Sequence, residues 1–303
     1  MKKYYGVIPP IITPVDELEN VDEQGFRALL RHCADHGLHG MFVAGSNGET
    51  MALTQEQRDK AIQISISEVG HRMPVMCGVM DTSTRRVIEN IKRMEQNGGT
   101  CAVVTSIFYA RHTSQDETIR HFEKISRETS TDIFIYNIPM FTGLSLGFDT
   151  VRRIATMDRV VGYKDSGGNL PDFIKCLNHF KGTDFSLLQG MTNLAAPSML
   201  MGADGFIPSI APLFPELFVA AYEAGKAGDI ARTMELNELL AGTSAILGMS
   251  KNATASNKFA LSQLGFTNKR VIAPQDSITD AEETSITRKT AEINETLRRA
   301  GIL

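Results

Sequence analysis

A lysine stands at the end of a short apolar run, where packing alone gives no reason for an ammonium group. The run is Val160–Lys164, and the small residues Asp165–Gly168 follow it. If the run is a buried strand of a (β/α) barrel, Lys164 lies at its carboxyl end, where the loops of that fold form the active face. An amine at such a position can condense with a ketone to a Schiff base, which helps to make or break the adjacent carbon–carbon bond. Lys164 is therefore the predicted nucleophile.

The surroundings of this lysine decide whether it can react. Only the neutral amine is a nucleophile, and burial in an apolar barrel mouth lowers a lysine pKa in the required direction. A phenol near the reacting bond can carry the proton, and a hydroxyl can relay it. The chemistry thus requires a fold that brings hydroxyl groups from several strand ends to the lysine.

Strands and helices are predicted to alternate along the first 228 residues. Apolar runs predict strands at 7–14, 41–44, 74–79, 100–107, 133–136, 160–164, 185–188 and 205–207. Helical spacing predicts helices at 22–36, after Thr54, and at 83–96, 115–128, 148–156, 171–180, 194–201 and 216–226. Thr54 with Gln57 predicts a capping box. Strict alternation with short connections implies a parallel sheet.

Eight units, without a G-x-G-x-x-G after the first strand, favour a closed barrel over an open doubly wound sheet. Residues 229–303 differ, because they show helical patterns without strands, with a break near 267–276 and a restart at Thr279. The predicted fold class is α/β: a (β/α)8 TIM barrel in residues 1–228, with a C-terminal helical extension in 229–303 packed on it.

The composition is that of an ordinary globular protein. Hydrophobic residues make up 42%, charged residues 22%, and the net charge is -4, which favours neither a nucleic acid nor an anionic membrane as partner. The four cysteines are far apart without C-x-x-C spacing, as expected for core residues in a reducing compartment. No apolar run has transmembrane length and the N-terminus lacks a signal-peptide core. We expect a cytoplasmic protein.

The strand ends offer no other chemistry. They carry no cluster of His, Asp and Glu that could bind a metal, and no paired carboxylates for glycoside hydrolysis. We expect neither a metal nor a cofactor, and covalent catalysis by an amine fits the inventory best.

Three ordered motifs carry a family resemblance. They are Gly45–Glu49, Tyr136–Pro139 and Lys164–Gly168. The chain resembles, over essentially its whole length, the dihydrodipicolinate synthase and N-acetylneuraminate lyase superfamily of class I aldolases. The resemblance implies that Lys164 forms the Schiff base with pyruvate or another 2-keto acid. It also implies that Tyr136 is the proton-transferring phenol and that Ser46 is the hydroxyl linked to it.

The resemblance assigns further positions. The Gly45–Glu49 amides and Asn47 would bind the 2-keto acid carboxylate, and other residues would line or orient the imine: Thr13, Ser166, Gly190 and Ile207. Tyr109 matches a tyrosine that many members lend to a neighbouring subunit, which implies a homotetramer built as a dimer of dimers. Structural roles remain open as alternatives, because Ser46 and Asn47 form turns readily and the others stand at strand termini.

Two departures from the family pattern bear on the substrate. Phe141 replaces the arginine with which dihydrodipicolinate synthases grip the aldehyde's carboxylate, and 191–193 lack the Asp-Glu pair of sialic acid lyases. Phe141 and Met140 predict a less charged aldehyde pocket. The favoured reaction is retro-aldol cleavage of a 2-keto-3-deoxy sugar acid or 4-hydroxy-2-oxo acid. The alternatives are a 4-hydroxy-tetrahydrodipicolinate synthase, a 2-keto-3-deoxy sugar acid dehydratase and a non-catalytic sugar-acid sensor.

Overall fold

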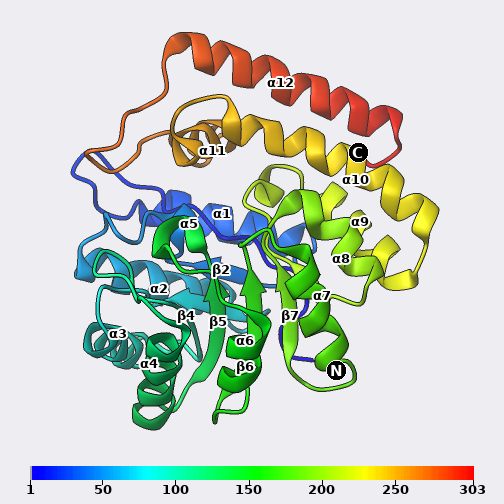
Figure 1. Cartoon of the computed structure of the whole chain (residues 1–303). Helices are drawn as coiled ribbons and strands as arrows, with labels where there is room; N and C mark the ends of the chain where they lie inside the picture. The colour runs from blue at the N-terminus through cyan, green and yellow to red at the C-terminus, as the bar shows by residue number, and fades with distance from the viewer. Residues whose placement is uncertain (1) are drawn as a thin grey trace.

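The sheet of this protein consists of parallel strands surrounded by helices (Figure 1). The structure is a computed structural model that describes residues 2–303. The strand order is β1-β8-β7-β6-β5-β4-β3-β2. The strands are β1 Gly6–Val7, β2 Met41–Val43, β3 Val75–Gly78, β4 Cys101–Thr105, β5 Asp132–Asn137, β6 Val160–Asp165, β7 Ser186–Gln189 and β8 Gly205–Phe206.

The two ends of the sheet meet through the extended segment after β1. Pro10 forms a parallel bridge with Phe42 of β2, the N–H of Phe42 donates to Pro9 O at 2.9 Å, and the N–H of Ile11 donates to Phe42 O at 2.8 Å. Prolines lack the N–H that a continuous ladder requires, so the predicted strand 7–14 is reduced to β1 and this bridge. These bonds close the sheet, and the predicted (β/α)8 barrel is confirmed.

The helices follow the predicted alternation closely. Around the barrel lie α1 Glu23–Asp35, α2 Gln55–Val69, α3 Thr84–Gln96, α4 Gln115–Glu128, α6 Phe148–Ile154, α7 Leu170–His179, α8 Ala195–Leu200 and α9 Pro215–Ala227. A short helix, α5 Pro139–Thr142, was not predicted. The prediction of a capping box at α2 was half wrong. Thr54 accepts from the N–H of Gln57, but the Gln57 side chain binds Val21 N and Asn20 Oδ1 instead of returning to Thr54.

The helical extension lies along one side of the barrel. Its helices are α10 Ile230–Ser244, α11 Ala253–Ser262 and α12 Asp280–Arg299, and Figure 1 shows α12 running beside α10 and α11. In residues 229–303, all of which the structure describes, there is no strand. Across residues 2–303, none of the helices combines the length and the apolar character needed to cross a bilayer.

Alternate side chains of each strand fill two cores. On β5, Phe134 and Tyr136 point into the barrel, where they join a cluster with Phe42, Leu188 and Ile207. The intervening β5 side chains pack outward against the helices. This period of two fixes which strand residues can reach the barrel mouth. All four cysteines are free and buried, as predicted.

Candidate active site

Lys164 lies on β6 with its side chain inside the barrel mouth. In the sheet register it is the direct neighbour of Tyr136 on β5 and of Leu188 on β7. The residue is only 3% exposed. Its Nζ lies 3.9 Å from the centroid of the Tyr136 ring and 4.7 Å from that of Phe42. The barrel therefore places the predicted nucleophile and the predicted phenol side by side.

The amine of Lys164 is poised to be neutral. Burial lowers the pKa of Lys164 from its ordinary value of 10.5 to about 7. The two aromatic faces attract the cation, but no carboxylate forms an ion pair with Lys164 anywhere in residues 2–303, so desolvation prevails. The free amine that attacks a carbonyl is therefore populated at a much lower pH than for an ordinary lysine.

Hydroxyl groups from three strand ends meet at Tyr136. Burial raises the pKa of the Tyr136 phenol, while side-chain hydrogen bonding with Ser166 and Ser46 works in the opposite direction. Tyr136 lies near the end of β5, and its hydrogen-bond partners belong to the loops after β2, which carries Ser46, and after β6, which carries Ser166. Ser46, Tyr136 and Ser166, all predicted site residues, thus form one hydroxyl group cluster beside Lys164.

Asp165 fixes the loop that follows the lysine. Its carboxylate accepts hydrogen bonds from Asn137 Nδ2 at 2.7 Å, Tyr163 Oη at 3.0 Å and Gly167 N at 3.1 Å. Burial is the largest influence on the pKa of Asp165 and raises it, although these donors oppose it. Asn137 in turn accepts from Leu146 N at 3.0 Å. We assign Asp165 and Asn137 a positioning role. Both residues belong to the sequence motifs named above, but this role was not predicted from the sequence.

Gly190 leaves room for the Ser166 hydroxyl. A Cβ at Gly190 would lie 2.1 Å from Ser166 Oγ and 2.8 Å from Asp165 O. Gly190 N donates to Asp165 O at 2.7 Å, which draws the two backbones together. Ile207 is buried in the barrel-mouth cluster with Tyr136. In this structure both residues shape the site rather than present polar groups to it.

The Gly45–Thr50 loop is braced from two sides. Thr13 Oγ1 donates to Gly48 O at 2.8 Å. Asn47 Nδ2 donates to Pro10 O at 2.6 Å, and Asn47 Oδ1 accepts from Asn257 Nδ2 at 3.2 Å. Both ends of the Asn47 amide therefore bind protein atoms, and its contact with substrate stays a prediction.

Glu49, the last residue of the first motif, is paired with the helical extension. Lys258 of α11 forms an ion pair with its carboxylate, and the two side chains are 0% and 1% exposed. Glu49 Oε1 also accepts from Ile272 N at 2.8 Å. Burial lowers the pKa of Lys258, and the neighbouring Glu49 opposes that shift. No local sequence signal linked Lys258 to the site.

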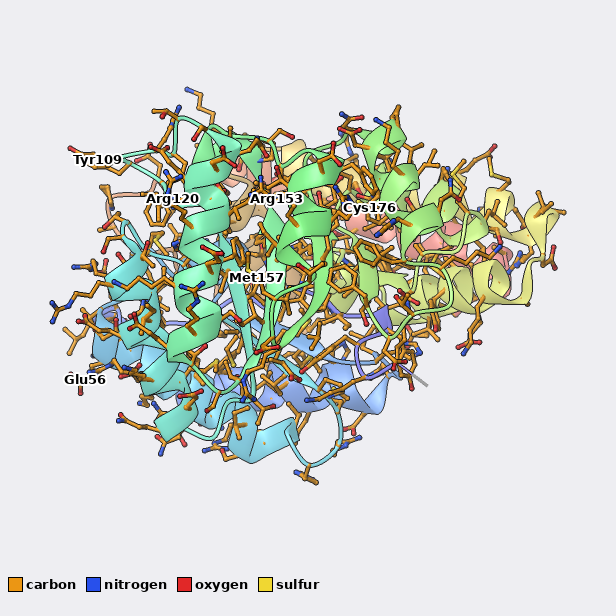
Figure 2. All side chains as sticks on the ribbon, turned by 60° about the horizontal axis from the view of Figure 1, so that its bottom comes forward. Glu56, Tyr109, Arg120, Arg153, Met157 and Cys176 are labelled. Atoms are coloured by element: carbon orange, nitrogen blue, oxygen red, sulfur yellow. The ribbon has the colours of Figure 1, made fainter. Side chains whose placement is uncertain are left out.

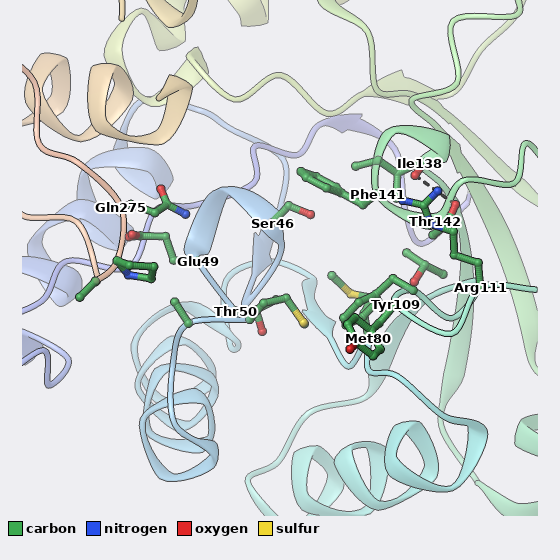
Figure 3. A pocket seen from close by; sticks show the side chains of 16 residues that line it. Ser46, Glu49, Thr50, Met80, Tyr109, Arg111, Ile138, Phe141, Thr142 and Gln275 are labelled. Carbon is green, nitrogen blue, oxygen red and sulfur yellow. Dashed lines mark hydrogen bonds between the residues drawn. The ribbon is translucent and has the colours of Figure 1, made fainter. Parts of the chain in front are cut away.

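A cavity of about 760 Å³ opens at the barrel mouth. Figure 3 shows Tyr109, Arg111 and Phe141 on one side of it, and Glu49 and Gln275 on the other. Tyr109 is 93% exposed, has a φ of 66°, and projects from the edge of the molecule in Figure 2.

Arg111 corrects the prediction of a weakly charged pocket. It follows Tyr109 by two residues in the β4–α4 loop and lines the same cavity as Phe141. Its side chain packs over Gly143, where an added Cβ would meet Arg111 Cδ at 2.6 Å and Nη1 at 2.7 Å. The pocket therefore contains a guanidinium group, that of Arg111, although position 141 is a phenylalanine. Among residues 2–303, no group of three or more His, Cys, Asp and Glu is arranged to hold a metal.

Comparison with known proteins agrees with this geometry. The family model of the dihydrodipicolinate synthetase family matches residues 3–293. The chain belongs to this family. It is similar to the 4-hydroxy-tetrahydrodipicolinate synthase of Methanopyrus kandleri, with 34% identity over 78% of this chain and 79% of the relative. It is also similar to a DapA-like lyase of Halobacterium salinarum, with 31% identity over 74% and 73%.

Solved structures of the family share the fold. The dihydrodipicolinate synthase of Bacteroides thetaiotaomicron superposes with a TM-score of 0.91 at 30% identity, over 96% of this chain and 99% of that one. The synthase of Acinetobacter baumannii, solved in complex with pyruvate, gives 0.89 at 25% identity over 99% of both chains. The protein is therefore an enzyme of the carbon–carbon lyase class.

Proposed function

We propose that the protein cleaves a 2-keto-3-deoxy sugar acid or a related 4-hydroxy-2-oxo acid into pyruvate and an aldehyde, through a Schiff base on Lys164. The observation that carries this proposal is a buried amine with a pKa of about 7, held 3.9 Å from the ring of a buried tyrosine. The binding of pyruvate by the similar Acinetobacter baumannii enzyme supports it.

The residues of the site supply each step. Neutral Lys164 attacks the C2 carbonyl of the 2-keto acid, the carbonyl oxygen departs as water, and one proton taken up from solvent leaves the imine protonated. As the C3–C4 bond breaks, the Tyr136 oxygen accepts the proton of the C4 hydroxyl and passes its own phenolic proton through Ser46 and Ser166 to solvent. The bonding electron pair moves toward the imine nitrogen and leaves an enamine, and the aldehyde departs. Return of the proton to C3 and hydrolysis of the imine by water release pyruvate and free Lys164.

The Gly45–Thr50 loop is the proposed site of the keto acid carboxylate. The backbone N–H groups of Ser46 and Asn47 donate to no protein acceptor among residues 2–303. The same loop presents the Ser46 side chain to Tyr136. A carboxylate bound there would hold the C2 carbonyl over the barrel mouth, between Lys164 and Tyr136.

Synthesis of 4-hydroxy-tetrahydrodipicolinate is the second candidate. Its support is the name of several relatives, among them the Methanopyrus kandleri enzyme at 34% identity. It uses the same imine in the direction of bond formation. A dehydratase of 2-keto-3-deoxy sugar acids would use it too, but releases neither pyruvate nor an aldehyde. A non-catalytic sensor has no need of a buried, neutralised amine, so it is the weakest alternative.

The proposed assembly is a homotetramer in which Tyr109 enters a neighbour's site. The 93% exposure of this aromatic residue at the rim of the cavity supports the proposal. The proposed compartment is the cytoplasm, where thiols such as the four free cysteines stay reduced. If sedimentation showed that the protein is a fully active monomer, Tyr109 could not be contributing to the site of a neighbouring subunit.

Trapping with borohydride tests the Schiff base. Incubation with pyruvate and sodium borohydride should add a reduced pyruvate group to Lys164, located by peptide mass spectrometry, and Lys164→Arg should remain unmodified. A panel of 2-keto-3-deoxy acids and 4-hydroxy-2-oxoglutarate, screened for pyruvate release, then separates the lyase from the other two reactions. Absence of an adduct on wild-type protein would overturn the proposal.

A further inference from the structure

The cavity is lined by buried and by exposed residues, and the buried ones lie next to the catalytic pair. Thr105 is buried and is the register neighbour of Tyr136, which is in turn the neighbour of Lys164, although Tyr136 and Lys164 themselves do not line the cavity. Phe141 and Tyr109, which line the same cavity, are exposed. A volume of about 760 Å³ greatly exceeds the needs of pyruvate. The remote end of a substrate held on Lys164 therefore points toward these loops.

Two ionised side chains line this cavity, and only one of them is available. The carboxylate of Glu49 is occupied by Lys258 and by Ile272 N. Arg111, by contrast, takes part in no ion pair and no side-chain hydrogen bond with any residue from 2 to 303, and it is exposed. The outer cavity thus carries one uncompensated positive charge.

The shape of the loop directs this charge. The stem of Arg111 rests against Gly143, whose φ of 70° suits a glycine, and no side chain separates the two residues. In Figure 3 the guanidinium lies beside Phe141 and Thr142 at the wall of the cavity. A guanidinium offers two parallel N–H donors that match a carboxylate or phosphate.

We infer that Arg111 binds an anionic group at the end of the substrate remote from the 2-keto acid. The aldehyde half then carries a carboxylate or a phosphate, and neutral aldehydes such as glyceraldehyde are poor partners. This inference rests on the proposed function, which places the keto acid on Lys164. It favours 4-hydroxy-2-oxo dicarboxylates and sugar acids with a second anionic group, and it applies equally if the reaction runs toward synthesis.

Matched aldehydes in the condensation direction test the inference. With pyruvate as donor, kcat/KM is measured for succinic semialdehyde against butanal, and for glyceraldehyde 3-phosphate against glyceraldehyde. In wild-type protein the anionic member of at least one pair should be preferred, and the favoured pair identifies carboxylate or phosphate. Arg111→Gln should lower the ratio of anionic to neutral kcat/KM by roughly 10- to 100-fold.

Two further variants sharpen the result. Arg111→Lys should retain part of the preference, because a point charge replaces the bidentate fork. Arg120→Gln removes an equal charge from the exposed face of α4, outside the cavity lining, and should leave the ratio unchanged (Figure 2). Equal kcat/KM values for the anionic and the neutral aldehyde of each pair, or an unchanged ratio in Arg111→Gln, would overturn the inference. The Schiff-base proposal would still hold if the pyruvate adduct formed on Lys164. Failure of wild-type protein to form that adduct would overturn both.

Discussion

Lys258 and Glu49 form an ion pair that is closed to solvent and joins the helical extension to the loop that carries Ser46. The neighbouring Asn257 reinforces the junction by donating to Asn47 Oδ1 and to Ser209 O at 3.1 Å. A buried pair of this kind contributes little net stability, but the loss of one partner leaves an unpaired charge in the interior.

Lys258→Met should destabilise the protein by about 3–5 kcal/mol, because Glu49 would be left charged and buried. The double variant Glu49→Gln with Lys258→Met should recover much of that loss. Urea unfolding of the two single variants and the double variant measures the coupling. Lys251→Met, on the exposed surface of the same extension, provides the control. Additive losses in the double variant would contradict an energetically coupled pair.

The rate of imine formation should rise with pH through about 7, the pKa to which burial lowers Lys164. Below that value the protonated amine predominates, so the logarithm of the rate should increase with a slope of about one per pH unit. Above about pH 8 the rate should level off. Initial rates of adduct formation with pyruvate give the profile. A rise that continues to about pH 10 would show an amine with its ordinary pKa.

Lys164→Met should abolish the adduct and stabilise the fold. Since the pKa of Lys164 is lower in the folded than in the unfolded chain, the unfolded chain binds more protons between the two values. The loss of folding stability caused by burying the Lys164 amine is therefore complete below about pH 7 and disappears as the pH approaches 10.5. The gain at neutral pH is at most about 5 kcal/mol. Urea unfolding near pH 7 and pH 10 should show that the stability gained by Lys164→Met becomes smaller as the pH rises. A gain that is independent of pH would argue that the burial of a protonated lysine is not its cause.

Tyr136→Phe should retain the pyruvate adduct and lose turnover by roughly 10²- to 10⁴-fold. The ring that covers Lys164 would remain, but the hydroxyl that exchanges protons would not. Steady-state kcat, compared with the extent of borohydride trapping, separates the two effects. Parallel loss of both would indicate that the phenol is needed already for imine formation.

Gly190→Ala should displace the Ser166 hydroxyl, because its Cβ would lie 2.1 Å from that oxygen. We expect a loss of stability of about 1–3 kcal/mol and a fall in kcat. Gly147→Ala is the matched control, since nothing lies within 4 Å of its Cβ position and its φ is -74°. A fully active Gly190→Ala enzyme would show that Ser166 is dispensable for turnover.

The sequence contained the barrel and the centre of the site because both follow from short-range patterns. Alternating apolar runs and helical spacing predicted the strand ends, and adjacent strands of a parallel sheet bring Tyr136 and Lys164 together. The shortened β1 was missed because prolines keep an extended segment out of the ladder. Gln57 satisfied a capping pattern but found better partners in a distant loop.

The residues that sequence reasoning missed act over long distances or from loops. Lys258 meets Glu49 only through the packing of α11 on the barrel. Arg111 belongs to a loop whose path determines whether its side chain reaches solvent or the cavity, and no local sequence pattern specifies that path. Its place two residues after Tyr109 was the one available signal. Oligomeric contacts of Tyr109 depend on a second chain and stay a prediction.

The wall of the cavity formed by Ala273, Pro274 and Gln275 belongs to the extension, not to the barrel. Loops tolerate substitution better than the strands that they connect. Natural drift in this short segment can therefore change which aldehydes are accepted without disturbing Lys164 or Tyr136. For protein engineers, a small library at these three positions is a means of redirecting the enzyme to new products while its bond-breaking apparatus stays intact.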